Sequence, residues 1–486
     1  MDDMYKHIMK YKFQKNERMK GGARVAIHHF YCPLPLYLER TKESYRVHAA
    51  AQEQMPGGVT ANIKHFAPYP IVMKGGDGAR LTDVDGNTYI DYLMGYGSLA
   101  LGHGHLAVTQ AVNSQMQKDG TCLFGTPHRL ETEYAKKIKC FFPSIERLRY
   151  TNSGTEATLL AIRFALAYTR KTKVAKFEGH YHGGFNEVLY SINPDEIKAG
   201  DAEEPLAVPE SAGLVPGGEK NTIILPFNNS HACETLLRKH QNDLAAVIIE
   251  PVQGGFIPAE QAFMTHLREV TRELGILLIF DEVKTGFRSA LGGAQSVYRV
   301  RPDLTTLGKV IGGGLPFGLV GGKKEIMDVS SPRSGSDVFD TLQSRGSSAE
   351  DTLFHSGTYN GHPMILAAGL AVIEELEKSY TKTLNFTCEL KNELASFFEG
   401  RGITVQTPGM GTIFNLVFAD GQIRNYRDLK KADLSFRKDL DFHLINEGIY
   451  TKPLNRYSIA TVHGEQELRK SIDALHNIFA HRTGRP

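Results

Sequence analysis

The chain has 486 residues, too many for one simple hydrophobic core, so two or more structural units are expected. With 41% hydrophobic and 23% charged residues its composition is that of a globular protein, and a formal net charge of +2 does not favour a nucleic-acid partner. No apolar run approaches the roughly 18 residues that a membrane span needs, so no membrane partner is expected.

Residues 1–40 are expected to form a basic N-terminal extension. The first 24 residues carry seven Lys or Arg against three Asp or Glu, and they lack the apolar stretch of a signal peptide. A short basic helix ending at Gly21-Gly22 and a loosely ordered extension are both open interpretations. The five cysteines are scattered and form no CxxC pair, which favours reduced thiols and, by default, a cytoplasmic location.

Residues 41–100 are expected to form the N-terminal segment of a small domain. A helix is predicted over residues 41–55, where Pro56-Gly57-Gly58 ends it. Short strands are predicted at 71–73 and 80–84, and the turn at Asp85-Gly86-Asn87 predicts a hairpin into residues 88–92.

Residues 101–365 are expected to form a large cofactor-binding domain. Strands are predicted at 148–151, 174–177, 245–249 and 276–280, and a helix at 155–170. Short apolar strands separated by helices indicate a mostly parallel sheet that is covered on both faces and binds ligands beyond the carboxyl ends of its strands. Residues 191–221 and 329–352 are expected to be long loops, serving as lids, dimer contacts or plain surface insertions.

Residues 366–486 are expected to form a C-terminal part of the small domain. Helices are predicted at 366–379 and 382–399, followed by strand segments near 403–418.

Asp281 and Glu282 follow directly after an apolar strand. A buried carboxylate is costly unless it has a cationic or hydrogen-bonding partner, and the protonated ring nitrogen of pyridoxal phosphate (PLP) would be such a partner. The alternative is that Asp281 caps a helix that follows the strand.

Lys309 lies between apolar residues and precedes Gly312-Gly313-Gly314. A lysine in an apolar pocket has a lowered pKa and becomes nucleophilic toward an aldehyde, and glycines let the backbone pass close to a bulky ligand. The 28-residue separation from Asp281 allows both side chains to follow neighbouring strand ends. The alternative is a surface lysine beside a flexible turn.

Two further segments follow predicted strand ends. Ser153-Gly154-Thr155 opens a helix, whose free amides suit a phosphate, although an ordinary helix cap with Thr155 as the capping residue would have the same sequence. Tyr181 and His182, flanked by glycines, can lie against a planar cofactor. His180 and His182 make a poor metal-ligand pair without a nearby carboxylate, so no metal is expected.

In this order the motifs resemble the class III PLP-dependent aminotransferases of fold type I, close to the glutamate-1-semialdehyde 2,1-aminomutase group. The likeness covers roughly residues 45–480. It rests on the following segments: Pro56-Gly57-Gly58-Val59, Asp83-Val84-Asp85-Gly86-Asn87, Leu101-Gly102-His103, Asn152-Ser153-Gly154-Thr155-Glu156-Ala157, Tyr181-His182-Gly183, Asp281-Glu282-Val283 and Gly308-Lys309. It implies an α/β fold: a large domain with a mostly parallel sheet flanked by helices, and a smaller α/β domain built from both ends of the chain.

The resemblance also implies roles. Lys309 would carry PLP as a Schiff base and shuttle the proton, Asp281 would pair with the ring nitrogen, and Tyr181 would stand near one ring face. The remaining residues implied to bind the cofactor are Ser153, Gly154 and Thr155 at the phosphate, Val283 on the other ring face, His182, Glu250, and Thr358 from a second subunit. The last role implies a homodimer with composite active sites.

Departures from the aminomutase pattern concern the substrate side. Lys64 stands in place of an arginine and Tyr96 in place of a tryptophan, Gln253-Gly254-Gly255 replaces Ala-Gly-Asn, and the segment containing Arg456 offers a base where the aminomutase has a glutamate. Lys64, Tyr96 and Arg456 are therefore the candidate substrate-binding residues.

Three functional hypotheses follow. The favoured one is an aminotransferase that moves an amino group from a small amino acid or amine donor to a keto acid or aldehyde through pyridoxamine phosphate. The second is an aminomutase that transfers the amino group within one molecule. The third is a cofactor-binding regulator or scaffold, which the intact pair of Lys309 and Asp281 argues against.

Overall fold

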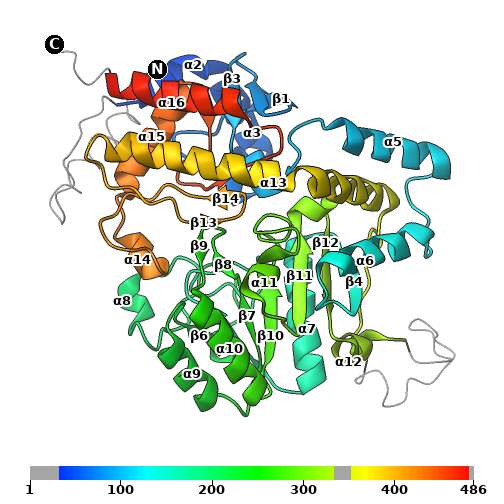
Figure 1. Cartoon of the computed structure of the whole chain (residues 1–486). Coiled ribbons are helices and arrows are strands. Elements are labelled where there is room, and N and C mark those ends of the chain that lie inside the picture. Colours follow the sequence, from blue (N-terminus) through cyan, green and yellow to red (C-terminus); the bar gives the residue numbers. More distant parts are fainter. Residues whose placement is uncertain (1–31, 333–351, 481–486) are drawn as a thin grey trace.

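The structure is a computed structural model that describes residues 32–332 and 352–480. The middle of the chain forms a larger unit, and the two ends of the described chain come together in a smaller one (Figure 1). The basic helix considered within the first 24 residues, and most of the loop expected at 329–352, lie outside the described residues.

A seven-stranded sheet forms the centre of the larger unit, in the order β4-β12-β11-β10-β7-β5-β6. Its strands are β4 (Arg147–Thr151), β5 (Lys173–Phe177), β6 (Thr222–Leu225), β7 (Leu244–Ile249), β10 (Leu277–Asp281), β11 (Leu304–Gly308) and β12 (Gly318–Gly322). Only β12 runs antiparallel to its neighbours, so the mostly parallel sheet predicted from the sequence is confirmed.

Alternate residues of each strand point to opposite faces of the sheet, and both faces are buried. Ala246 and Ile248 of β7 pack with α7 (Gly154–Thr169) on one face. Val247 and Ile249 pack on the other face with α9 (Ser230–Lys239) and α10 (Gln261–Glu273). The four predicted strands agree with β4, β5, β7 and β10 to within one residue at either end, whereas β6, β11 and the glycine-rich β12 were not predicted.

The other helical segments of the larger unit are short or lie at its edges. They are α5 (Leu106–Asp119), α6 (Arg129–Phe141), α8 (Glu196–Ala199), η3 (Gly218–Asn221), α11 (Gly293–Tyr298), η4 (Lys309–Gly312), α12 (Lys324–Met327) and η5 (Asp328–Ser330). A two-stranded ribbon, β8 (Val252–Gln253) and β9 (Ile257–Pro258), leaves the sheet after β7. Thus the loop predicted at 191–221 contains two short helical turns, α8 and η3.

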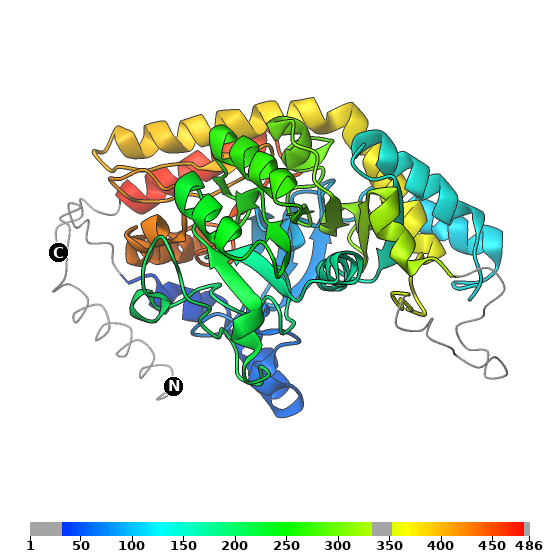
Figure 2. The ribbon, with the colours of Figure 1, turned by 90° about the horizontal axis from the view of Figure 1, so that it is seen from below.

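One helix of 37 residues, α13 (Pro363–Glu399), runs from the larger unit to the smaller one, along one side of the molecule in Figure 2. The sequence predicted two helices here, and that prediction is wrong. The expected break at 380–381 contains neither glycine nor proline, and tertiary contacts outweigh its weak helix propensity. Tyr380 is buried and its hydroxyl donates to the carbonyl oxygen of Arg288 (3.0 Å).

The smaller unit is built from both ends of the described chain. A four-stranded sheet joins β1 (Met73–Asp77), β2 (Arg80–Asp83), β3 (Thr88–Asp91) and β15 (Ile449–Tyr450) in that order. The predicted hairpin at Asp85-Gly86-Asn87 connects β2 to β3 as expected. The first strand begins at Met73, two residues later than predicted.

The helical segments of the smaller unit also come from both ends of the described chain. They are α2 (Leu34–Arg40), α3 (Lys42–Gln54), η1 (Pro56–Gly58), η2 (Asn62–Lys64), α4 (Met94–Gly97), α14 (Tyr426–Lys430), α15 (Leu434–Asn446) and α16 (Glu465–Ala480). Three short strands, β13 (Gly409–Met410), β14 (Ile413–Phe414) and β16 (Tyr457–Ser458), form a further sheet. Residues 34–40, expected in the extension, instead bury Leu34, Tyr37 and Leu38 against α15.

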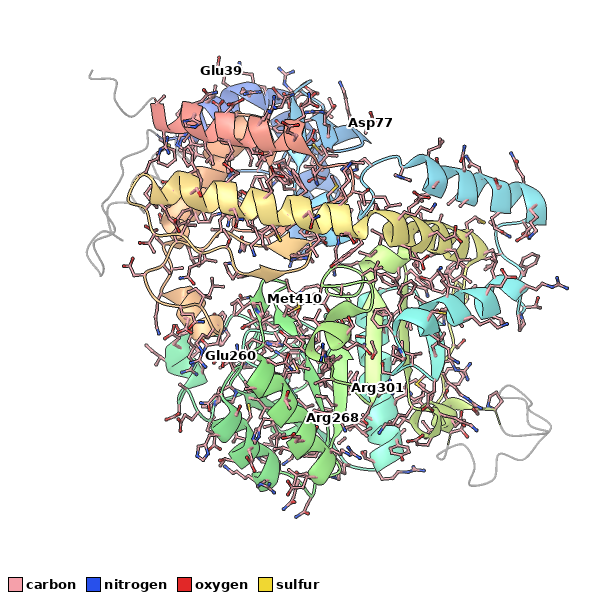
Figure 3. All side chains as sticks on the ribbon, viewed as in Figure 1. Glu39, Asp77, Glu260, Arg268, Arg301 and Met410 are labelled. Atoms are coloured by element: carbon pink, nitrogen blue, oxygen red, sulfur yellow. The ribbon has the colours of Figure 1, made fainter. Side chains whose placement is uncertain are left out.

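The two units share a packed boundary. Met410 of β13, labelled in Figure 3, packs against the core formed by α9 and α10. Arg288 is fully buried and donates to the carbonyl oxygens of Gly97 and Ile459, which belong to the two halves of the smaller unit. The five cysteines form no disulfide. No helix of the described chain has the length and apolar character to cross a membrane.

Candidate active site

Three chain segments meet at the carboxyl edge of the large sheet. Strand β10 ends at Asp281 and pairs in parallel with β11, which ends at Gly308, so Lys309 follows the strand end next to Asp281. Strand β4 ends at the same edge, because Gly318 of β12 lies between Thr151 and Gly308. The neighbouring strand ends inferred from the sequence are therefore present. Arg268 and Asp303, bonded at 2.8 Å, lie at the opposite edge, where Figure 3 labels Arg268.

Lys309 has a left-handed backbone, with φ +49°, at the start of η4. Burial is the main cause that lowers the pKa of its amine to about 7; the charges of Lys284 and Arg456 act in the same direction, and those of Asp281 and Glu250 in the opposite one. These four charged groups thus surround one amine.

The glycines after Lys309 serve the protein's own packing. A Cβ on Gly312 would lie 2.9 Å from Cβ of Phe317, and one on Gly313 would lie 2.9 Å from Cβ of Ala368 in α13. The sequence analysis expected these glycines to make room for a ligand. At these two positions they instead make room for neighbouring atoms of the protein itself. They let the turn that carries Lys309 sit directly on α13.

Asp281 is almost fully buried and is held by three hydrogen bonds. The Nδ1 of His182 donates to Oδ2 (2.7 Å), and the Val283 amide (3.1 Å) and the Thr306 hydroxyl (3.3 Å) donate to Oδ1. Burial alone would raise the pKa of Asp281, but the bond and charge of His182 and the charge of Lys284 outweigh it and hold the pKa below its ordinary value. The side chain is therefore a fixed carboxylate.

Glu282, the second carboxylate of the pair, has a structural role. It is fully buried and accepts hydrogen bonds from the amides of Ala294 (2.8 Å) and Gln295 (2.9 Å) at the start of α11, and from the hydroxyl of Thr285 (2.6 Å). Burial raises its pKa. Glu282, and not the Asp281 of the helix-capping alternative, therefore binds the start of a helix.

Glu250 follows β7 and is also buried. Its Oε1 pairs with Nζ of Lys284, and its Oε2 accepts from the amide of Tyr181 (2.9 Å). Burial would raise the pKa of Glu250, but the charges of Lys284, His180 and His182 hold it below the ordinary value. His180 accepts from the Glu250 amide (3.1 Å), so each histidine of the 180–182 pair is bonded to a different carboxylate-bearing residue.

Lys284 was missed by the sequence analysis. Its ammonium also stands 5.6 Å from the centre of the Tyr181 ring, on the side of the site that faces Glu250. The sequence does indicate such a role. Lys284 lies three residues after the end of a buried strand and close to two acidic residues, and a lysine in that position needs a partner at the same edge of the sheet.

The segment at the start of α7 forms a helix cap. Ser153 is the capping residue, rather than Thr155, and its hydroxyl accepts from the Glu156 amide (3.1 Å). A Cβ on Gly154 would lie 2.6 Å from Cγ1 of Val283, so only glycine fits here without displacing Val283. Among the described residues the amides of Gly154 and Thr155 have no partner, which leaves a helix start able to bind an anion.

Tyr181 and Val283 come from different loops at this edge. The Tyr181 side chain is 45% exposed, and its hydroxyl is hydrogen-bonded to Thr155. Val283 packs between Gly154 and Gly308, whose added Cβ atoms would lie 2.6 and 3.2 Å from it.

The candidate substrate residues come from the smaller unit. The guanidinium of Arg456 donates to the carbonyl oxygen of Tyr96 (3.0 Å), and the Tyr96 hydroxyl donates to the carbonyl oxygen of Ile63 (2.8 Å). Arg456 therefore connects to the turn that carries Lys64, whose own side chain is exposed. Thr358 is exposed and lines a surface cavity of about 390 Å³ with residues 123–128.

The described residues contain no group of three or more His, Cys, Asp or Glu side chains arranged to hold a metal ion.

The model of the family described as aminotransferase class-III matches residues 62–464. The chain belongs to the class III aminotransferases. A similar curated protein is the glutamate-1-semialdehyde 2,1-aminomutase of Ignicoccus hospitalis, which is 40% identical over 449 residues that cover 90% of this chain and 98% of the relative. The family and fold type expected from the sequence are confirmed.

Two solved class III structures are also similar to the chain. An omega-transaminase from Sphaerobacter thermophilus is 32% identical with a TM-score of 0.84, covering 92% of this chain and 100% of that one. A β-phenylalanine aminotransferase from Variovorax paradoxus is 32% identical with a TM-score of 0.78, covering 92% and 95%.

Class III aminotransferases use PLP, the cofactor predicted from the sequence. The residues of this site fit that group. Lys309 offers an amine with a lowered pKa, Asp281 offers a fixed carboxylate, and the first amides of α7 are free. Membership of this family also favours the enzyme hypotheses over the regulator or scaffold.

Proposed function

We propose that the chain catalyses amino-group transfer with PLP held at Lys309, and that the transfer runs between two small molecules. The observation that supports the chemistry is the position of the Lys309 amine, with its lowered pKa, beside the buried Asp281 at neighbouring strand ends. When bound, PLP supplies an aldehyde that takes the amino group and a ring that withdraws electrons from the reacting carbon.

The residues around Lys309 would divide the work. As an uncharged amine near neutral pH, Lys309 takes a proton from the reacting carbon and returns it. Asp281 keeps the cofactor's ring nitrogen protonated, and His182 orients Asp281. The segment from Ser153 to Thr155 holds the phosphate.

Tyr181 and Val283 flank the cofactor's ring, and Glu250 stands beside it. These assignments rest on the shared sheet edge and on the hydrogen bonds described above.

Arg456, a base where the aminomutase pattern has a glutamate, supports transfer between two molecules, and its surroundings fit a substrate with a carboxylate. Its Nε is buried without a partner among the described residues, close enough to Lys309 to affect the pKa of its amine. A carboxylate of the donor or of the keto acid acceptor would satisfy it, with Lys64 and Tyr96 at the outer part of the same wall.

The intramolecular reaction is a second candidate, and the curated relatives favour it more directly than the first. The similar protein of Ignicoccus hospitalis carries the name glutamate-1-semialdehyde 2,1-aminomutase. The two reactions differ in stoichiometry, since a mutase needs one substrate and no acceptor.

We further propose a homodimer in which Thr358 completes the phosphate site of the partner subunit. Exposed aromatic side chains near Thr358 support this, namely those of Phe124, Phe354 and Tyr359. A cytoplasmic location belongs to the same proposal, because the five cysteines form no disulfide.

A panel of amines tests the function. The purified yellow protein is mixed with α-, β- and ω-amines, and the absorption band of the bound cofactor is followed. Bleaching by an amine, with recovery only when a keto acid is added, supports transfer between molecules. Complete turnover of glutamate-1-semialdehyde alone would instead establish the mutase. Lys309→Ala should abolish bleaching, and normal bleaching in that variant would refute the assignment of Lys309.

A further inference from the structure

Glu250 has two cationic neighbours, and it is bonded to only one of them. Lys284 pairs with its Oε1, whereas Arg456 makes no hydrogen bond to it among the described residues. Burial lowers the pKa of Arg456, and the nearby charge of Glu250 acts in the opposite direction. Glu250 and Arg456 both lie against the turn after β8. Oε2 of Glu250 accepts from the Gly254 amide (3.5 Å), and Arg456 packs on the next residue, where a Cβ on Gly255 would lie 3.0 Å from its Nε.

The pairing leaves Arg456 with unused donors. Among the described residues its guanidinium makes one side-chain hydrogen bond, from Nη2 to Tyr96, and its Nε is buried without an acceptor. An unpaired buried donor is costly, so Arg456 would turn to an available carboxylate if one were free nearby. Glu250 is such a carboxylate, and Lys284 already occupies it.

We propose that Lys284 is a specificity-determining positioning residue, which pairs with Glu250 and thereby keeps Arg456 free for a carboxylate of the substrate. The inference rests on the proposed function, because it assigns the substrate class of the same site. The site would take amines that carry a carboxylate, and Lys284 would act on them through Glu250 without touching them.

The neutral variant Lys284→Met removes the cation and keeps a side chain of similar length. Glu250 then becomes the partner of Arg456, and a substrate carboxylate must displace it. A charge-assisted hydrogen bond of this kind corresponds to about 10- to 100-fold in binding. The concentration of a carboxylate-bearing amine that gives half-maximal bleaching should therefore rise by about that factor.

Two comparisons separate this role from a merely structural one. A primary amine without a carboxylate should bleach the variant and the original protein at the same half-saturating concentration. Lys284→Arg, which retains the cation, should restore the original value for the carboxylate-bearing amine. Lys284→Gln, a second neutral variant, should behave as Lys284→Met does.

A binding measurement completes the test without turnover. Glutarate, which has no amine, is titrated into the cofactor-loaded protein in a calorimeter. We expect binding about 10- to 100-fold weaker in Lys284→Met than in the original protein and in Lys284→Arg. Equal affinity in all three proteins, or an equal loss for amines with and without a carboxylate, would overturn the inference. If no amine bleaches the original protein, the proposed function itself fails.

Discussion

The most direct test of the site concerns the amine of Lys309 in the cofactor-free protein. Its pKa is lowered from 10.5 to about 7, mainly by burial. At pH 7 roughly half of this amine is uncharged, compared with about one part in 3,000 for an ordinary lysine. Its reaction with an electrophile should therefore be roughly 10³-fold faster than that of a lysine with the ordinary pKa.

The assay is pulsed reductive methylation of the cofactor-free protein across pH 5.5 to 9.5, with the peptide containing Lys309 quantified by mass spectrometry. The labelling rate should rise with pH and level off above a midpoint near 7. Ordinary exposed lysines should still be gaining reactivity at the top of the range, because their pKa is near 10.4.

Lys284→Met should move the Lys309 midpoint to higher pH, since it removes a nearby cation that lowers the pKa of the Lys309 amine. A Lys309 profile that follows the exposed lysines throughout would refute the argument that this amine is desolvated.

Three further predictions concern single side chains. Asp281→Asn should retain the fold and lower the rate of the half-reaction by about 10²- to 10³-fold, because the ring nitrogen loses its counter-charge, and a near-normal rate in stopped-flow absorbance would remove Asp281 from the mechanism. Gly154→Ala should weaken cofactor binding in a fluorescence titration, because the new Cβ would lie 2.6 Å from Val283 Cγ1. Adding Val283→Ala should recover the affinity. No recovery in the double variant would contradict this packing argument. His463 has a pKa of about 4 instead of 6.5, so as the pH falls the unfolded chain takes up the proton before the folded one does. The stability that neutral His463 contributes is therefore complete above pH 6.5 and is lost as the pH falls toward 4. The loss is about 3 kcal/mol at most, and His463→Gln should show a smaller fall in thermal midpoint between pH 7 and pH 4.5, whereas an unchanged fall would exclude His463 as its source.

The placement of Asp281 and Lys309 at neighbouring strand ends could be predicted because local sequence determines it. Each residue follows an apolar strand directly, and strands of a parallel sheet end at one edge. The hairpin at Asp85-Gly86-Asn87 was equally local. By contrast, β12 has three glycines in five residues and little β propensity of its own, so its place between β4 and β11 depends on tertiary pairing.

The roles of individual polar side chains were harder to predict. Glu282 and Asp281 are neighbours in sequence, yet one caps α11 and the other faces the site, because successive residues point in opposite directions. The pairing of Lys284 with Glu250 joins positions 34 residues apart, and only the folded sheet brings them together. The wrong break in α13 has the same origin, since the contact of Tyr380 with Arg288 spans 92 residues.

The pairing of β3 with β15 has a consequence for how the chain folds during synthesis. Ile90 lies opposite Ile449, so the first half of that sheet must wait on the ribosome until nearly the whole chain has been made. The central strands, from β4 to β12, have their partners within residues 147–322 and can assemble earlier. The edge of β3 that pairs with β15 therefore stays without its partner strand until late in synthesis.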